Sequence, residues 1–320
     1  MQDQPSQSLP PAPDLHEAPT AHPAIPPGRQ LFFQRLHPVA FALLSLVIVF
    51  FLYQVVAGGI TLLLSRGKIT VDTVPLVRWS TLVGQLLFIL VPTLVLVRLR
   101  TGSWVQFLRI RLPEATQIIV SIVAVFALQQ VLQCYMFLQE AIPLPAPVQE
   151  FVDQFKQIIE ETYRLLVQSQ SVWEFLFVVV VVVLVPSITE ELLFRGLVQG
   201  SFEEARGGLW GAVLAGVIFG AYHLNPFSFI PLISLGIYFG FLVYRSQNIT
   251  IAVSAHFFNN FIACVAAYLQ LDEAFVAVSP GHSPSAEMVF ANFMLFAIVF
   301  LSATYYFIRI TSPAQESAAP

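Results

Sequence analysis

Three short groups of polar residues interrupt the most hydrophobic part of the sequence, and together they could activate a water molecule. They supply two carboxylates, two imidazoles and one carboxamide, from Glu190, Glu191, His223, His256 and Asn260. Glu190 could act as a general base toward water, while His256 and Asn260 donate hydrogen bonds to an oxyanion. Alternatively, Glu190, His223 and His256 could hold a divalent metal such as zinc, which lowers the pKa of its bound water. Asn is a better oxyanion donor than zinc ligand, which favours the metal-free route.

The spacing of these residues predicts which of them share a helix face. Side chains four residues apart lie one above the other on a helix, so Glu191 should pair with Arg195. By the same spacing, His256 should pair with Asn260. Glu190 should point about 100° away from Glu191, and the two carboxylates are therefore expected to have different partners.

Counting residues from the connecting turns places the three groups at a similar depth. Glu190 and His223 lie on either side of the turn at residues 205–208, each about 25 Å from it at ~1.5 Å per residue. His256 and Asn260 lie about 14 and about 20 Å beyond a later turn on the same side. In an antiparallel bundle the three groups should therefore meet in one layer.

The composition shows what kind of elements must position these side chains. Of the 320 residues, 57% are hydrophobic and only 11% are charged, whereas soluble proteins carry about 25% charged residues. A soluble globular domain is therefore excluded, and the apolar residues suffice for about eight membrane-spanning helices of ~20 residues each. The net charge of −4, with basic residues that are scattered, also excludes a nucleic-acid partner.

Intervals without charged residues mark the expected helices. They cover residues 36–65, 79–97, 115–139, 175–189, 207–244, 246–271 and 288–308. Asn225-Pro226 breaks the fifth interval into two, which gives eight spans in an all-α bundle. The fourth interval is short, so its helix should continue through Glu190 and Glu191.

Four segments of different character follow from these spans. Residues 1–35 form a Pro-rich tail that is expected to be disordered, and residues 36–170 hold the N-terminal membrane helices and a connector. Residues 171–270 form the membrane core with all candidate site residues, and residues 271–320 hold the last span and a short tail. The connector at 146–170 is expected to be an amphipathic helix on the outer face, or else a solvated linker.

The basic residues predict the orientation in the membrane. The loop 98–114 carries Arg98, Arg100, Arg109 and Arg111 and should be cytoplasmic under the positive-inside rule. Both termini then lie on the cytoplasmic side, and the acidic connector 140–174 lies on the opposite side. This bias fits an integral protein of the plasma (inner) membrane.

Pairs of glycines four residues apart permit close contact between helices. They are Gly207 with Gly211, Gly216 with Gly220, and Gly236 with Gly240. Packing inside the bundle is the expected use, and the interface of a homo-oligomer is the alternative.

Other intramembrane protease classes are excluded by missing residues. Asp occurs only at positions 3, 14, 72, 153 and 272, outside every expected span, which excludes an aspartyl protease. The sequence has no Gly-x-Ser-x-Gly and no His-Glu-x-x-His zinc motif. Cys134 and Cys264 lie in apolar stretches and are expected to be buried core residues.

The order and spacing of the three groups resemble the CPBP family, which comprises the CaaX prenyl endopeptidases and the bacteriocin-processing or immunity proteins also called Abi. The matching motifs are Glu190-Glu191-x-x-x-Arg195, Phe219-x-x-x-His223 and His256-x-x-x-Asn260. The flanking Gly196 and the pair Gly236 and Gly240 agree with this pattern. The resemblance covers roughly residues 172–265.

The resemblance implies an α-helical intramembrane endopeptidase that removes the last three residues after a prenylated cysteine. In this pattern Glu190 would activate the water with the help of His223. His256 and Asn260 would stabilise the oxyanion or, in a metalloprotease, contribute ligands.

The resemblance also assigns supporting residues and partners. Glu191 and Arg195 would support the site, and Phe219 would be a packing residue. The expected partners are membrane lipid and a membrane-bound or lipidated peptide substrate. Two other interpretations stay open: a non-catalytic scaffold or immunity protein of the same fold, and a transporter, which the scarcity of ionisable residues in the first three spans and the eighth disfavours.

Overall fold

The structure is a computed structural model that describes residues 32–101, 104–269 and 285–311. Within these ranges all regular elements are helices, as predicted. The predicted disordered tail at 1–35 is partly corrected, because its last residues form the short helix α1 (Phe32–Arg35). Arg100 holds this helix with hydrogen bonds of 2.8 Å to the Phe33 carbonyl and 2.7 Å to the Leu36 carbonyl. Residues 1–31 lie outside the described ranges.

Eight helical spans follow one another, and three of them combine α-helical segments with π-helical segments, labelled η. The first is α2 (Pro38–Phe50), η2 (Phe51–Ala57) and α3 (Gly58–Leu64); the second is α4 (Val74–Gln85), η3 (Leu86–Leu90) and α5 (Val91–Thr101). The third is α7 (Ala115–Glu140), and the fourth is α9 (Val172–Val179), η4 (Val180–Leu184), α10 (Val185–Glu191), η5 (Leu192–Gln199) and α11 (Gly200–Arg206). The remaining four are α12 (Gly208–Tyr222), α13 (Phe229–Ser246), α14 (Ile249–Tyr268) and α16 (Ala286–Ile310).

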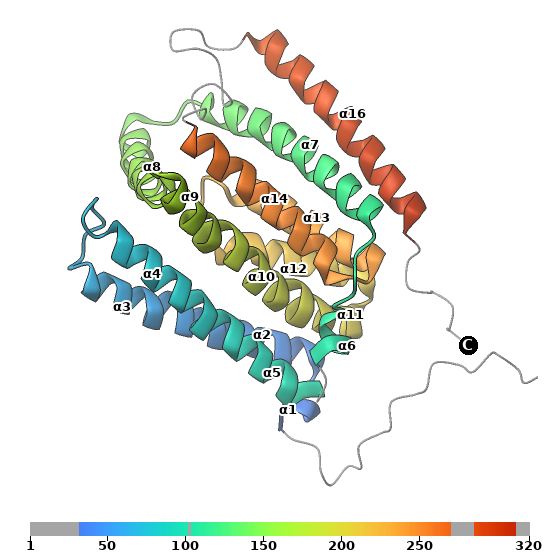
Figure 1. Cartoon of the computed structure of the whole chain (residues 1–320). Coiled ribbons are helices and arrows are strands. Elements are labelled where there is room, and N and C mark those ends of the chain that lie inside the picture. The colour runs from blue at the N-terminus through green and yellow to red at the C-terminus, as the bar shows by residue number, and fades with distance from the viewer. Residues whose placement is uncertain (1–31, 102–103, 270–284, 312–320) are drawn as a thin grey trace, which may run out of the picture.

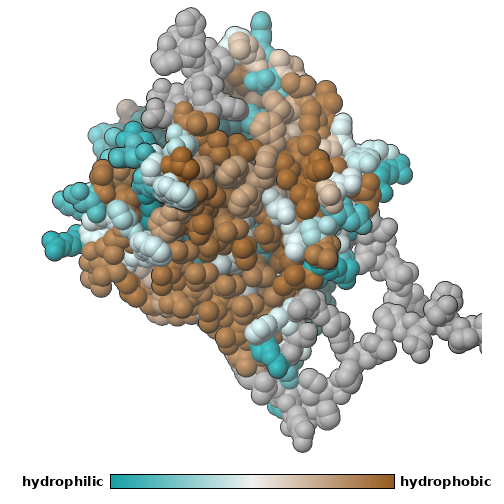
Figure 2. All heavy atoms as spheres, in the orientation of Figure 1, coloured by the Kyte–Doolittle hydropathy of each residue, from teal (hydrophilic) through white to brown (hydrophobic). Residues whose placement is uncertain are grey.

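The lengths of these helices bear out the predicted membrane spans. Seven of the described helices are long and apolar enough to cross a membrane, and α12 is a shorter apolar helix. Hydrophobic residues cover most of the described face in Figure 2, whereas hydrophilic residues gather mainly at its margins. The protein is therefore an integral, multi-pass membrane protein.

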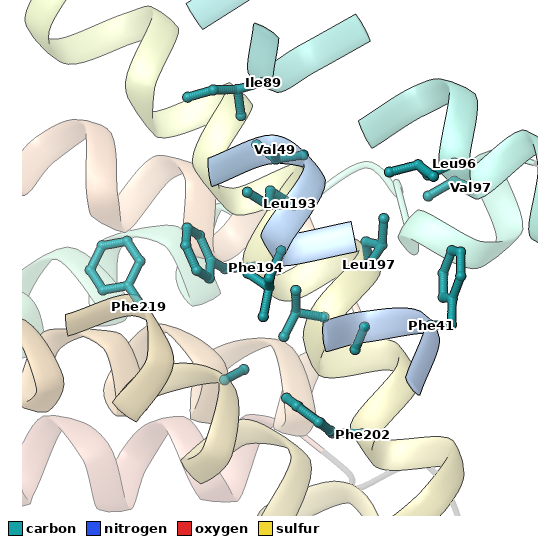
Figure 3. Packing of buried hydrophobic residues seen from close by; sticks show 14 of the residues in the cluster. Phe41, Val49, Ile89, Leu96, Val97, Leu193, Phe194, Leu197, Phe202 and Phe219 are labelled. Atoms are coloured by element: carbon teal, nitrogen blue, oxygen red, sulfur yellow. The ribbon is translucent and has the colours of Figure 1, made fainter. Parts of the chain in front are cut away.

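The fourth span lies near the middle of the bundle and carries the two glutamates. In Figure 1 the first two spans pack on one side of it, and α12, α13 and α14 lie on the other, with α7 and α16 beyond them. Its packing against α2 and α12 forms the hydrophobic cluster in Figure 3, which includes Phe41, Leu193, Phe194 and Phe219. The helix continues past both glutamates to Arg206, as predicted, and Gly207 then turns the chain with a φ of +89°.

The glycine pairs bring α12 and α13 into direct backbone contact. A Cβ atom at Gly216 would lie 2.3 Å from the Ile237 nitrogen, and one at Gly236 would lie 2.6 Å from the Gly216 carbonyl oxygen. These approaches leave no room for a side chain. The glycines therefore serve packing inside the bundle, as expected.

Two further helices, one long and one short, connect the spans at opposite ends. The connector predicted at 146–170 is the helix α8 (Ala146–Val167), and Arg78 bonds the carbonyl of Leu165 at 3.3 Å and that of Leu166 at 2.9 Å near its end. At the other end, α6 (Trp104–Leu108) precedes Arg109, which pairs with Glu203 at 2.7 Å. The helix α8 is thereby fixed to the second span, and the loop after α6 to the fourth. Both cysteines are free and buried, as expected.

Candidate active site

The two glutamates at the end of α10 have different surroundings, as their angular separation predicted. The Glu191 side chain is completely buried, whereas the Glu190 side chain keeps 21% of its surface exposed. The π-helical segments η4 and η5 lie directly before and after α10, and such segments occur frequently at functional sites. The local structure therefore presents one carboxylate to the core and the next to an open space.

Glu191 is held by two partners in the core. Its Oε1 atom lies 3.1 Å from Nη1 of Arg195 and 2.9 Å from Nδ1 of His256. Arg195 is also fully buried, and its Nη2 donates a 2.9 Å hydrogen bond to the Gly236 carbonyl. A buried carboxylate needs such compensation, because an unpaired charge in an apolar interior costs several kcal/mol.

Aromatic rings surround the buried guanidinium of Arg195. Its Cζ atom lies 4.5 Å from the ring centre of Phe219, 5.4 Å from that of Phe239 and 6.0 Å from that of Phe194. Cation–π contacts of this kind strengthen when water is excluded. Figure 3 shows Phe194 and Phe219 at the edge of the hydrophobic cluster. Phe219 thus packs against the site, in the role that the family resemblance implies for it.

His223 faces the open glutamate. Its Nε2 atom lies 3.9 Å from Oε2 of Glu190, and its side chain is 32% exposed. Its Nδ1 lies 2.8 Å from the Phe219 carbonyl, which can only accept, so Nδ1 carries a proton. In the neutral imidazole Nε2 then carries a lone pair, and in that form Glu190 and His223 present two hydrogen-bond acceptors to the space between them.

His256 is fixed differently from the prediction. The spacing predicted a pair with Asn260, but the Nδ1 atom of His256 donates to Glu191, because α14 packs directly against α10 at this level. The imidazole stacks on Phe239 with ring centres 5.1 Å apart and meets the Phe219 ring edge-on at 5.9 Å. These contacts leave Nε2 of His256 as its second polar atom for a ligand.

Asn260 lies one helical turn beyond His256. Its Nδ2 is 3.5 Å from the Val182 carbonyl on η4, and its Oδ1 accepts a 3.1 Å hydrogen bond from Asn259. The longer of these contacts is at the limit of a hydrogen bond, so the carboxamide can exchange it for a better acceptor.

The geometry of the donors bears on the proposed metal ligands. Among the described residues, no group of three or more His, Cys, Asp and Glu side chains is arranged to hold a metal ion. The set of Glu190, His223 and His256 is divided, because His223 faces Glu190 while His256 bonds Glu191. This donor set does not fit a metal ion in the observed arrangement, and metal dependence stays a prediction.

Sequence reasoning did not single out Phe239 or the Gly236 carbonyl. Both belong to α13, where Phe239 stacks on His256 and Gly236 accepts from Arg195. The sequence contains one indication of these two residues: they lie in the stretch from Gly236 to Gly240, for which the glycine pair predicts close contact between helices.

Comparison with known proteins identifies a family that resembles part of the chain. Residues 172–262 match the family model described as type II CAAX prenyl endopeptidase Rce1-like. All the candidate catalytic and supporting residues lie within this match, which confirms the resemblance to the CaaX protease family that the three motifs indicated. No curated protein and no solved structure matches the chain. At the level of the family, the match supports a CAAX-type intramembrane protease.

Proposed function

We propose that the protein is an intramembrane endopeptidase that hydrolyses a peptide bond in a membrane-bound, prenylated CaaX-type substrate. The observation that carries this proposal is the open Glu190 carboxylate, which lies 3.9 Å from His223 while its neighbour Glu191 is locked in the core. The family match at residues 172–262 supports the substrate class.

The attacking water lies between Glu190 and His223 in this mechanism. It donates one hydrogen bond to Oε2 of Glu190 and one to the lone pair on Nε2 of His223, which orients its own lone pair toward the substrate. Glu190 takes a proton as the water oxygen bonds to the carbonyl carbon, and the carbonyl π electrons move to the oxygen. When the oxyanion re-forms the carbonyl and the C–N bond breaks, Glu190 returns the proton to the leaving nitrogen, which yields a carboxylic acid and a free amine. The acid then loses the second proton of the water to solvent and becomes a carboxylate.

His256 and Asn260 stabilise the oxyanion. Because Nδ1 of His256 donates to Glu191, Nε2 can donate only when the ring is protonated. The Glu191 carboxylate is already paired with Arg195, so the added charge of that ring is offset by the oxyanion that it binds. The Asn260 carboxamide exchanges its 3.5 Å contact with the Val182 carbonyl for the oxyanion. A single donor of this kind contributes about 10²–10³-fold to the rate.

Mass spectrometry of a prenylated CaaX peptide incubated with the purified full-length protein tests the proposal. We expect the wild type to release the terminal tripeptide and the Glu190→Gln variant to release none. Cleavage by the variant at the wild-type rate would contradict the role of Glu190. Absence of cleavage by the wild type would contradict CaaX specificity and favour the scaffold interpretation.

Chelation separates the two chemical routes. Activity that survives prolonged treatment with 1,10-phenanthroline supports the metal-free mechanism. Activity that is lost and then restored by added zinc would support a metal site formed by Glu190, His223 and His256.

A further inference from the structure

A second carboxamide lies directly beside the proposed oxyanion donor. Asn259 precedes Asn260 on α14, and its Nδ2 atom lies 3.1 Å from Oδ1 of Asn260. The motif His256-x-x-x-Asn260 leaves position 259 open, and the proposed hydrolysis does not use its side chain. Asn259 is therefore a polar residue of the membrane core without an assigned role.

This contact is not a consequence of helix geometry alone. Consecutive side chains of an α-helix point about 100° apart and do not face each other, so the two carboxamides have to turn toward each other to bond. The Nδ2 atom of Asn260 meanwhile stays 3.5 Å from the Val182 carbonyl on η4, a segment that packs against α14. The Asn260 carboxamide is thus held between its neighbour on α14 and the span that carries the glutamates.

The contact with Asn259 selects which end of the Asn260 carboxamide faces η4. The oxygen and the amino group of a carboxamide are similar in size but opposite in hydrogen-bond polarity. In the observed orientation the Asn260 oxygen accepts from Asn259, and its amino group faces the Val182 carbonyl. In the reversed orientation two amino groups would face each other, and two oxygens would do the same at Val182. Both pairs repel, so the two neighbours together exclude the reversed form.

The other end of Asn259 makes the folded protein less stable. Its Oδ1 atom is buried and has no hydrogen-bond partner within the described part of the chain. Such an oxygen loses its hydrogen bonds to water on folding and gains none in return, which an apolar side chain of the same shape would avoid. Stability alone thus gives little reason for a carboxamide at this position, whereas the bond to Asn260 gives one.

The second proposed oxyanion donor is oriented in a similar way. Nδ1 of His256 lies 2.9 Å from Oε1 of Glu191, which fixes the direction of the ring. Glu191 therefore orients His256, and Asn259 orients Asn260. In both pairs the bond leaves the other end of the donor for the substrate.

We propose that Asn259 is a positioning residue that orients the Asn260 carboxamide, so that Nδ2 of Asn260 is presented to the oxyanion. During hydrolysis Nδ2 leaves the Val182 carbonyl, and the bond from Asn259 to Oδ1 then keeps the carboxamide from turning over. This effect on catalysis rests on the proposed function, whereas the bond between the two side chains does not.

Kinetics on the prenylated peptide test the catalytic effect. We expect Asn259→Leu to lower kcat about tenfold, the preference that one hydrogen bond supplies for one orientation, with KM unchanged. In the Asn260→Ala background the same change should have no further effect, because Asn259 acts through Asn260. Ser254→Ala is the matched control, since Ser254 is a polar residue of the same helix whose hydroxyl bonds the Thr250 carbonyl at 2.8 Å. Wild-type kcat in Asn259→Leu, or an equal loss in both backgrounds, would overturn the proposal.

Thermal unfolding separates orientation from packing. Asn259→Leu removes the unpaired Oδ1 together with the bond, so its Tm should stay within about 2 °C of the wild type. A larger fall in Tm alongside the fall in kcat would indicate a packing role and overturn the proposal. If leucine prevents folding, Asn259→Ala decides by the same kinetic comparison.

A thermal double-mutant cycle with Asn259→Leu and Asn260→Ala does not depend on activity. The Tm shifts should depart from additivity by about 2 °C, since each single variant removes the same bond. Additive shifts would overturn the proposal. If the wild type cleaves no peptide, the proposed function fails, and this cycle alone decides whether Asn259 holds Asn260.

Discussion

Glu190 and Glu191 are adjacent in the chain but belong to two regions of opposite character. The region around Glu191 is closed: the carboxylate has no exposed surface and is held by Arg195 and His256 at 3.1 and 2.9 Å. The region around Glu190 is open, and its carboxylate lies 3.9 Å from His223. The same functional group is thus a structural anchor at one position and is available for chemistry at the next.

The difference shows how a membrane protein can fix the position of one carboxylate without bonding that carboxylate itself. Two polar contacts of the closed region join different spans: Arg195 on η5 reaches α13 through the Gly236 carbonyl, and Glu191 on α10 reaches α14 through His256. The helix that carries Glu190 is thereby fixed without any restraint on Glu190 itself. Changes in the closed region should therefore alter stability, and changes in the open region should alter activity.

The largest effect should come from Glu190→Gln, which removes the proposed general base and leaves the packing intact. We expect a fall in peptide cleavage of about 10²–10⁴-fold, while the Tm stays within about 2 °C of the wild type. Cleavage and thermal unfolding are measured on the same detergent preparation. A variant that loses stability along with activity would contradict the separation of the two regions.

Arg195→Leu should have the largest effect on stability. It leaves Glu191 buried with only His256 as partner, so the free energy of unfolding should fall by about 3–5 kcal/mol. Adding Glu191→Leu should restore part of this loss, because the uncompensated charge is then gone. The free energy of unfolding of both variants is measured in mixed micelles. An unaltered value in Arg195→Leu would contradict the stabilising role of the closed region.

Gly236→Ala should have a smaller effect on the closed region. The added Cβ would meet the Gly216 carbonyl oxygen at 2.6 Å, and overpacking of this kind costs about 1–3 kcal/mol. Gly59→Ala is the matched control, because a Cβ at that helical glycine meets nothing within 4 Å. We expect the control to be neutral or more stable by up to ~1 kcal/mol. Equal Tm values for the two variants would show that α12 and α13 can separate freely.

The smallest effect should come from Lys156→Met on α8. Lys156 pairs with Glu140 and Glu160, whose side chains are 54% and 64% exposed, so the loss should be only about 0.2–1 kcal/mol. Burial alone would lower the pKa of Lys156, but the two carboxylates raise it above its ordinary value.

The contribution of Lys156 should therefore depend on pH. A folded-state pKa above that of the unfolded chain means that the stabilisation is complete below about pH 10.4 and is lost as the pH rises through the folded value. The Tm difference between wild type and Lys156→Met, measured at pH 7 and at pH 11, should shrink at the higher pH. A difference that grows with pH would contradict the ion pair.

Much of the fold could be predicted from the sequence because lipid imposes a simple rule on it. A charge-free apolar interval of sufficient length must be a helix, and this located all eight spans and the continuation through Glu190. The Glu191–Arg195 pair also followed, since spacing along one helix is fixed. The short helix at 32–35 did not follow, because it depends on Arg100, which is distant in sequence.

Contacts between helices were harder to predict. His256 bonds Glu191 rather than Asn260 because α14 packs on α10, and helix spacing carries no information on such neighbours. Predicted features that concern the membrane side of the termini and the type of membrane stay predictions.

The shortness of α12 has a consequence for the lipid around the site. Its 15 residues extend about 22 Å at 1.5 Å per residue, against about 30 Å of hydrocarbon in a typical bilayer. Bilayers meet such hydrophobic mismatch by thinning locally, so lipid beside the C-terminal end of α12 should dip toward His223. Bulk water would then come close to the proposed site without a dedicated channel, and the rate of hydrolysis should fall as the acyl chains of the host membrane lengthen.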